Sequence, residues 1–327
     1  VGAGYWGPNL IRNFVAKRGC SELWVCERDE ARLERIKERY PSVRATTSFD
    51  EVLNSDIDGV VIATTVGTHY PLATQALEAG KHVFVEKPLA ASVEQAQSLV
   101  EQAERSDRRL MVGHTFEYSP PVMKLGELIR GDVLGRIFFI SSNRVNLGLH
   151  QKDISEVWDL APHDFSILFY WLDDRPVTIS AMGRDFVQEG IPDVAFISVE
   201  FSSGTLAHLE VSWLSPSKLR RTTIVGAKKM AVYDDTEAFE KVKIFDRGVD
   251  YKDPETFGEF QLSYRTGDIV SPRLDSFEPL SVEADEFLSA ISEGRRPRSD
   301  GRSGLRVVEA LAAAERSLLE GGQPIRL

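Results

Sequence analysis

The chain begins with Val1-Gly2-Ala3-Gly4-Tyr5-Trp6-Gly7, and this stretch predicts the fold of the first domain. Three glycines at these offsets let a strand turn sharply into a helix while the backbone comes close to a pyrophosphate. The amides at the start of that helix, from Pro8 onward, then face the phosphate charge. The spacing is a weak signal when it stands alone, because glycine-rich turns are common.

The residues after the turn strengthen this interpretation. Pro8 favours the first turn of a helix, and a strand pattern at 23–26 ends on Glu27, where an acid would bind a ribose 2′-hydroxyl. Arg28 leaves NADP open, because an arginine there can accept a 2′-phosphate. The first strand would precede Val1, so we expect a few apolar residues upstream of this numbering. The predicted dinucleotide contacts in this region are Gly2, Gly4, Tyr5, Trp6, Gly7, Glu27 and Arg28.

Composition limits the class of protein. A length of 327 residues suits two domains. The formal charge of −11 argues against nucleic acid as a partner, and no apolar run approaches the length of a membrane span. The two cysteines, Cys20 and Cys26, lack metal-ligand spacing, so we expect no metal and a reduced, cytoplasmic setting.

Strand and helix patterns alternate over residues 1–118, which predicts a doubly wound parallel sheet of the Rossmann type. The expected strands lie at 43–46, 59–63, 82–85 and 110–113. The second domain, 119–327, shows closely spaced strand patterns that predict an α+β domain with a mainly antiparallel open sheet. They lie at 136–145, 177–184, 194–201, 205–213, 219–225, 229–233 and 240–246. Residues 248–280 are predicted to be irregular, as a long excursion or an arm that contacts another subunit, and helices are expected at 282–293 and 304–319.

Two segments leave the carboxyl ends of predicted strands, where ligands bind in such sheets. One contains Thr64, Thr65, Val66 and His69, and the other is Glu86-Lys87-Pro88. An ammonium group at the position of Lys87 could stabilise a reacting oxygen as an alkoxide. The alternative is a surface lysine that only pairs with Glu86.

Asp159 and His163 form a second candidate pair. Pro162 suggests that a buried helix begins there. His163 would then lie in its first turn, where the helix dipole disfavours the imidazolium form. A neutral imidazole can accept a proton from an alcohol, and Asp159 would orient it or help to hold the substrate hydroxyl. The alternative is that Asp159 caps the helix and His163 packs in the core.

Other candidates are weaker. His114 and Tyr118 follow the last strand of the first domain and either touch the nicotinamide or substrate, or pack internally. A set of basic residues either converges on an anionic group such as a diphosphate or forms a solvated strand face. This set is Arg144, Lys152, Lys218, Arg220 and Arg221.

The chain resembles the Gfo/Idh/MocA oxidoreductase family nearly end to end. The resemblance rests on the glycine turn, the segment from Ala63 to His69, Glu86-Lys87-Pro88, and the pair Asp159 and His163. It implies that Lys87, Asp159 and His163 are the catalytic residues. It also implies a Rossmann domain that binds NAD, and an open sheet that forms contacts in a homodimer or homotetramer. Thr65 replaces the proline that many members carry, and Glu27 replaces their usual aspartate.

Three further stretches are similar to those of members from sugar-biosynthesis clusters, some of which oxidise the 3-hydroxyl of a UDP-hexose such as UDP-N-acetylglucosamine. These stretches are 146–148, 158–164 and 212–226. We therefore expect an NAD-dependent dehydrogenase of a nucleotide sugar. A dehydrogenase of a free sugar, cyclitol or sugar acid, and a non-catalytic dinucleotide-binding regulator, remain the alternatives.

Overall fold

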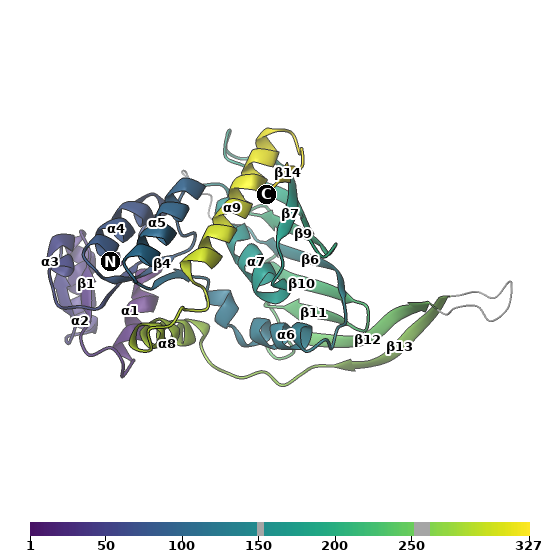
Figure 1. Ribbon diagram of the computed structural model, residues 1–327, viewed down its shortest axis with the longest axis horizontal. Helices are drawn as coiled ribbons and strands as arrows, with labels where there is room; N and C mark the ends of the chain where they lie inside the picture. Colours follow the sequence, from purple (N-terminus) through teal and green to yellow (C-terminus); the bar gives the residue numbers. More distant parts are fainter. Residues whose placement is uncertain (149–153, 252–261) are drawn as a thin grey trace. The chain divides into compact units, whose positions relative to one another are not determined.

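The computed structural model describes residues 1–148, 154–251 and 262–327 (Figure 1). The chain divides into two compact units. The N-terminal unit contains Val1–Ser119 and Ser276–Ala312, and the C-terminal unit contains Pro120–Asp275 and Ala313–Leu327.

The N-terminal unit is built from parallel strands. β1 (Trp24–Cys26) pairs with β2 (Arg44–Thr46), and β4 (His82–Glu86) lies between β3 (Gly59–Ile62) and β5 (Leu110–Gly113). The helices between these strands are α1 (Gly7–Val15), α2 (Glu30–Arg39), α3 (Phe49–Leu53), α4 (Val66–Glu78) and α5 (Val93–Arg105). This alternation confirms the predicted Rossmann fold.

The backbone of Val1 and Gly2 links the two groups of strands. Gly2 N–H donates to the Cys26 carbonyl at 2.9 Å, and Ala63 N–H donates to the Val1 carbonyl at 2.9 Å. The first two residues therefore lie between β1 and β3.

Side-chain caps explain where several helices begin. The Asp29 side chain accepts a hydrogen bond from Arg32 N–H at the start of α2, and Ser92 accepts one from Gln95 N–H at the start of α5. Such caps satisfy amide groups that have no partner within the helix.

Two C-terminal segments belong to the N-terminal unit, so the division differs from the boundary expected at 118/119. α8 (Pro279–Ser292) packs against α1 and the short 3₁₀ helix η1 (Thr115–Tyr118). Its residues Leu280, Ala284 and Phe287 join the same buried cluster as Leu10 and Phe84. α9 (Gly301–Leu319) begins in this unit and ends in the other. Apolar burial brings these segments back to the first domain across 156 intervening positions.

The C-terminal unit contains a nine-stranded sheet among its described residues, in the order β13-β12-β11-β10-β6-β9-β8-β7-β14. All neighbouring pairs are antiparallel except β6 and β9, which are parallel. The strands are β6 (Ile137–Val145), β7 (Pro176–Arg184), β8 (Val194–Phe201), β9 (Leu206–Ser212), β10 (Leu219–Gly226), β11 (Met230–Asp234), β12 (Val242–Tyr251), β13 (Leu262–Val270) and β14 (Ile325–Arg326).

The β12–β13 hairpin corrects the expectation that 248–280 is irregular. The two strands pair from Ile244 opposite Val270 to Tyr251 opposite Leu262. Figure 1 shows this hairpin extending well beyond the other strands of the sheet. The mixed polar and apolar sequence of β13 hid the strand pattern, because its residues are mostly exposed and need no apolar alternation.

Helix α7 (Glu156–Leu172) covers one face of this sheet and contacts β6, β8 and β9. It begins at Glu156, with Ser155 at the N-cap, so the expectation of a helix start at Pro162 is wrong. Pro162 lies inside the helix instead. α6 (Pro120–Arg130) packs against α7, and the Trp171 indole N–H donates to the Val122 carbonyl at 2.8 Å. No helix in the described part of the chain is long and apolar enough to cross a membrane.

Candidate functional site

The glycine turn has the geometry of a pyrophosphate-binding loop. Gly2 has φ +88°, and a Cβ there would lie 2.7 Å from the Ala63 carbonyl oxygen. A Cβ on Gly7 would lie 2.2 Å from the Gly2 oxygen, so neither position tolerates a side chain. At Gly4 the nearest atom to such a Cβ is 3.7 Å away. The first and third glycines therefore close the turn, whereas the second leaves space for a ligand.

Glu27 supports this turn from the end of β1. Its carboxylate accepts hydrogen bonds from Ala3 N–H at 2.6 Å and Asp29 N–H at 3.0 Å. Burial alone would raise the pKa of Glu27, but these amide hydrogen bonds lower it below its usual value. An anion is thus held beside the glycine turn, and its contact with the ribose stays a prediction. Tyr5, Trp6 and Arg28 are exposed nearby. These residues fit a bound NAD.

His69 joins the loops that leave β3 and β4. Its Nδ1 lies 2.9 Å from the Pro88 carbonyl oxygen, and its Nε2 lies 3.1 Å from the Thr64 carbonyl oxygen. The side chain is buried, and this burial lowers its pKa. The His69 ring therefore connects the loop after β3 to the loop after β4. Thr65 is exposed, while Thr64 and Val66 are half-buried.

Lys87 follows directly after β4 and is half-buried. Burial raises the pKa of the neighbouring Glu86 carboxyl to about 7, although the Lys87 ammonium opposes this increase. Burial also lowers the pKa of His114 to about 3, and the Lys87 charge lowers it further. The charge of Lys87 thus interacts with the neutral imidazole of His114 and with the Glu86 carboxyl, whose pKa is about 7.

Two predicted substrate residues of this unit are in the core. His114 is 0% exposed, which favours the packing alternative. Tyr118 is also 0% exposed, and its hydroxyl is 2.8 Å from the Ser299 hydroxyl oxygen. The expected substrate contact of Tyr118 is therefore corrected, because its hydroxyl is already used within the fold.

In the C-terminal unit, α7 brings Asp159 and His163 onto one stripe. Residues four apart lie on the same side of a helix, and both side chains are half-buried while Trp158, Ala161 and Pro162 are buried. The Trp213 indole N–H donates to Asp159 Oδ2 at 3.3 Å. His163 lies two turns into the helix, so the expected effect of the helix N-terminus on its charge does not apply.

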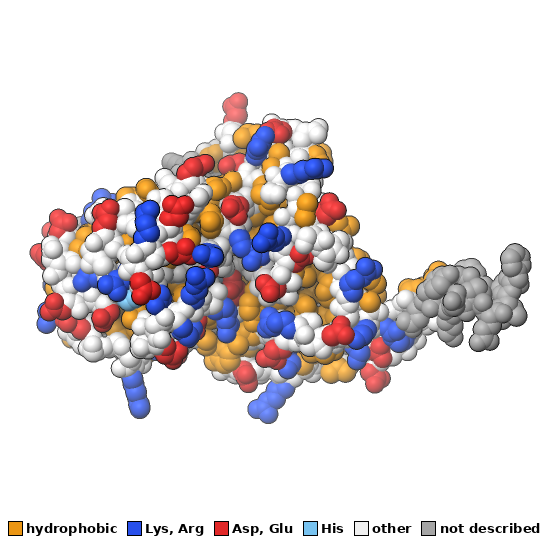
Figure 2. Space-filling model, in the orientation of Figure 1, with side chains coloured by type: hydrophobic (Ala, Val, Ile, Leu, Met, Phe, Trp, Pro, Cys, Tyr) orange, Lys and Arg blue, Asp and Glu red, His pale blue; other side chains and the backbone are white. Residues whose placement is uncertain are grey.

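The basic residues of this unit do not form one group. Arg144 is buried in an ion pair with Asp164, and Arg220 pairs with Asp235 at 3.5 Å. Arg221 lies on the opposite face of β10 from Arg220 and is exposed, as is Lys218. Lys152 lies outside the described residues. The expected diphosphate site at Arg144 is thus corrected. Figure 2 shows acidic and basic side chains interspersed over the visible face of the protein.

Two acidic residues with structural consequences were not singled out from the sequence. Glu283 of α8 is buried, accepts a hydrogen bond from the Thr115 hydroxyl at 2.8 Å, and has a pKa raised well above its usual value by burial and by Glu86. Asp164 of α7 carries the buried ion pair with Arg144. In both cases the available signal was an acid among apolar residues at helical spacing. Glu283 is flanked by Leu280, Ala284 and Phe287. Asp164 lies between Ala161 and Phe165.

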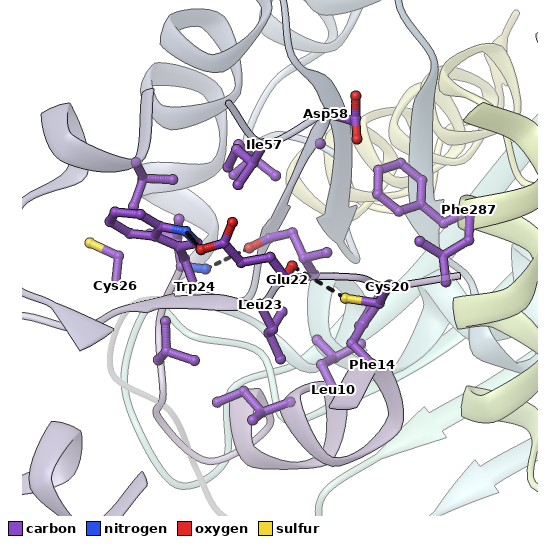
Figure 3. Close-up of a pocket in the computed structure, with 18 of the residues that line it drawn as sticks. Leu10, Phe14, Cys20, Glu22, Leu23, Trp24, Cys26, Ile57, Asp58 and Phe287 are labelled. Carbon is purple, nitrogen blue, oxygen red and sulfur yellow. Dashed lines mark hydrogen bonds between the residues drawn. The ribbon is translucent and has the colours of Figure 1, made fainter. Parts of the chain in front are cut away.

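A cavity of about 410 Å³ lies along the facing edges of β1 and β3 (Figure 3). Leu10, Phe14, Trp24 and Phe287 contribute to its lining. It follows the side of these strands and extends to the residues before them, whereas ligands bind at the carboxyl ends of strands in such sheets. We therefore assign no ligand to it.

Similarity to known proteins agrees with this geometry. Residues 1–114 match the oxidoreductase family with an NAD-binding Rossmann fold, and residues 122–232 match the GFO/IDH/MocA C-terminal domain. An uncharacterized oxidoreductase of Streptococcus pneumoniae serotype 4 is 27% identical over 64% of this chain, and the match spans 60% of that protein.

The UDP-N-acetylglucosamine 3-dehydrogenase of Acidithiobacillus ferrooxidans is 27% identical over 82% of this chain and 80% of its own length. Its crystal structure, that of GnnA, matches with a TM-score of 0.81 at 24% identity, covering 98% of this chain and 96% of that one. GenD2 from gentamicin A biosynthesis, solved in complex with NAD, matches with a TM-score of 0.83 at 24% identity, covering 100% and 94%. Both domain models match in the expected order, so the chain belongs to the Gfo/Idh/MocA family of NAD-binding oxidoreductases.

Proposed function

We propose that this protein transfers a hydride between a sugar hydroxyl carbon and NAD, with C3 of a UDP-hexose such as UDP-N-acetylglucosamine as the reacting position. The observation that carries the proposal is the pair Asp159 and His163 on the half-exposed stripe of an otherwise buried helix. An otherwise buried helix gains no apolar packing from an aspartate and a histidine at this spacing. Lys87, at the end of β4, supplies the complementary cation.

The residues that would hold NAD are the glycine turn, Glu27 and the loops after β3 and β4. When bound, NAD supplies the hydride acceptor. In our proposal His163 accepts the hydroxyl proton of the sugar, and Asp159 orients the imidazole. Lys87 stabilises the alkoxide that develops as the hydride leaves. In the reverse direction Lys87 polarises the ketone and His163 returns the proton.

The choice of a UDP-hexose is supported by the similarity to the Acidithiobacillus ferrooxidans enzyme. Arg144 does not support this choice, because its guanidinium is buried in an ion pair with Asp164. A dehydrogenase of a free sugar, cyclitol or sugar acid would use the same three residues and remains the alternative.

Turnover assays decide between these substrates. The purified chain is mixed with NAD or NADP and with UDP-N-acetylglucosamine, glucose, myo-inositol or gluconate, and NAD(P)H absorbance is followed. We expect turnover with UDP-N-acetylglucosamine and NAD, and a product with a keto group at C3 by NMR. Turnover only with an unconjugated sugar or polyol would favour the alternative substrate class. Tight NAD binding without turnover on any of them would instead indicate a non-catalytic regulator.

We also propose that the chain assembles into a homodimer or homotetramer. The face of the large sheet opposite α7 exposes apolar side chains on adjacent strands. Phe139 of β6 is in register with Leu206 of β9, and Met182 of β7 is in register with Phe196 of β8. These four side chains are between 44% and 64% exposed, and contiguous exposed apolar surface of this kind is typical of protein interfaces.

A further inference from the structure

One ion pair is buried between α7 and the sheet of the C-terminal unit. Arg144 of β6 is 5% exposed and Asp164 of α7 is 3% exposed. Arg144 Nε donates to Asp164 Oδ2 at 2.6 Å, and Arg144 Nη2 donates to Oδ1 at 3.3 Å. The hydroxyl of Ser142 donates to Asp164 Oδ1 at 2.8 Å. One carboxylate therefore accepts three hydrogen bonds from two residues of a single strand.

This ion pair fixes the orientation of its two side chains but adds little to the free energy of unfolding. Taking two charges out of water costs about as much as their attraction returns, so such a pair gives little net stabilisation. Burial alone would lower the pKa of Arg144, yet the Asp164 carboxylate raises it above its usual value, so the guanidinium stays charged. A two-pronged contact between guanidinium and carboxylate is satisfied in only one orientation.

Helix α7 needs such an orienting contact because its surface is apolar almost all round. Val157, Ile167 and Phe169 are buried on three different sides of the helix, since consecutive residues are about 100° apart. Apolar packing is non-directional, so several rotations about the helix axis bury similar area. Asp164 is tied to β6 through Arg144 and Ser142, and this contact selects one rotation.

The selected rotation determines where the reactive side chains point. Consecutive residues on a helix are about 100° apart, so anchoring Asp164 fixes the direction of its neighbour His163. Asp159 lies one turn earlier on the same stripe as His163. The hydrogen bond from the Trp213 indole to Asp159 provides a second anchor toward the N-terminal end of the helix.

We propose that Arg144, Asp164 and Ser142 lock the rotation of α7 and are positioning residues for Asp159 and His163. The catalytic consequence rests on the proposed function. The rotational lock itself does not.

The test uses the full chain and three variants. Arg144→Met/Asp164→Leu removes both charges without leaving one of them buried alone, a replacement that buried pairs often tolerate. Arg144→Lys keeps the charge but loses the two-pronged contact, and Ser142→Ala removes one hydrogen bond. The control Arg316→Gln/Glu320→Gln removes an ion pair from the surface of α9 in the same unit.

Two readouts separate positioning from general damage. We expect the double variant to bind NAD as the wild type does, because the glycine turn and Glu27 lie in the other unit. With UDP-N-acetylglucosamine we expect kcat to fall by about tenfold to a hundredfold, with a smaller change in KM. The second readout is the ¹⁵N NMR signal of the His163 ring, assigned with His163→Asn. We expect one tautomer in the wild type and control, and a mixture of tautomers in the double variant.

An unchanged kcat and a single His163 tautomer in the folded double variant would overturn the lock. If that variant does not fold, Arg144→Lys decides. We expect it to lower kcat and alter the pH profile, and native values for both would likewise overturn the lock. If His163→Asn keeps the kcat of the wild type, the proposed function fails instead, and the NMR readout still decides whether the lock exists.

Discussion

The carboxylate of Glu27 binds two backbone amides, Ala3 N–H and Asp29 N–H, so it holds the glycine turn and also places a negative charge there. A negative charge at this position repels the 2′-phosphate of NADP. The exposed Arg28 next to it would attract the same phosphate. We expect the balance of these two neighbours to set the preference between NAD and NADP.

Glu27→Gln is expected to reduce the preference for NAD over NADP by roughly tenfold, because the amide keeps the shape but loses the charge. The ratio of the two dissociation constants, measured by fluorescence titration, checks this expectation. Glu30→Gln is the control, since Glu30 is an exposed acid in the first turn of α2. An unchanged ratio in Glu27→Gln would show that Glu27 does not govern the preference.

Lys87 provides the sharpest test at the residue scale. Lys87→Ala is expected to lower kcat by about a hundredfold or more while leaving NAD affinity nearly unchanged, because its main contribution is to the transition state. The control is Lys81→Ala, since Lys81 lies just before the same strand and donates to the Ser55 carbonyl at 2.6 Å. Wild-type kcat in Lys87→Ala would contradict the proposed mechanism.

At the scale of elements, α8 connects the end of the chain to the NAD-binding unit. Phe287 is 2% exposed and contacts the rings of Phe14 and Phe84, with ring centroids 6.4 Å and 5.7 Å away. The helix is therefore part of the core that supports α1 and β4. This role was not expected from its place in the sequence.

Phe287→Ala is expected to lower the free energy of unfolding by about 3–5 kcal/mol, because it leaves a cavity in that core. Denaturant unfolding of the whole chain measures the loss. Phe277→Ala provides a matched control, because Phe277 precedes the same helix but is 37% exposed, and its replacement should cost much less. Equal losses in the two variants would show that α8 is not part of this core.

The 3₁₀ helix η1 contributes a pH dependence. Burial raises the pKa of Glu117 to about 8, above its value of about 4.5 in an unfolded chain. Between these values the folded state binds the proton that the unfolded state has lost. The contribution of Glu117 to the free energy of unfolding is thus fully present below pH 4.5 and falls as the pH rises toward 8.

Glu117→Gln should reduce this loss, which amounts to at most about 5 kcal/mol for such a shift. Urea unfolding at the two ends of the window measures the difference between the variant and the wild type. Glu38→Gln, which changes an exposed acid on α2, should leave the slope of the free energy of unfolding against pH unchanged. A slope in Glu117→Gln as steep as that of the wild type would assign the pH dependence to other buried acids, such as Glu283.

At the scale of the whole molecule, we expect the exposed apolar face of the large sheet to form the contact between subunits. Phe139→Glu/Leu206→Glu places two charges on adjacent strands in the middle of that face and is expected to yield monomers. Light scattering coupled to size-exclusion chromatography measures the mass. The control Val249→Glu changes an exposed apolar residue on the β12 hairpin strand. If the double variant keeps the mass of the wild type, assembly does not use this face.

The sequence by itself determined the local features, because these depend on residues close together in the chain. The spacing of Gly2, Gly4 and Gly7 predicted the turn that the structure contains. The alternation of strands and helices predicted the fold class of the first domain, and closely spaced strand patterns predicted that of the second. Family membership followed from short motifs such as Glu86-Lys87-Pro88.

Only the tertiary structure decided which charged residues are accessible and which are used inside the fold. Arg144 looked like an anion-binding residue until Asp164, twenty positions away, was found beside it. Tyr118 and Ser299 meet although 181 positions separate them, and α8 returns to the first unit in the same way. Such contacts depend on burial summed over distant segments, and no local spacing in the chain encodes them.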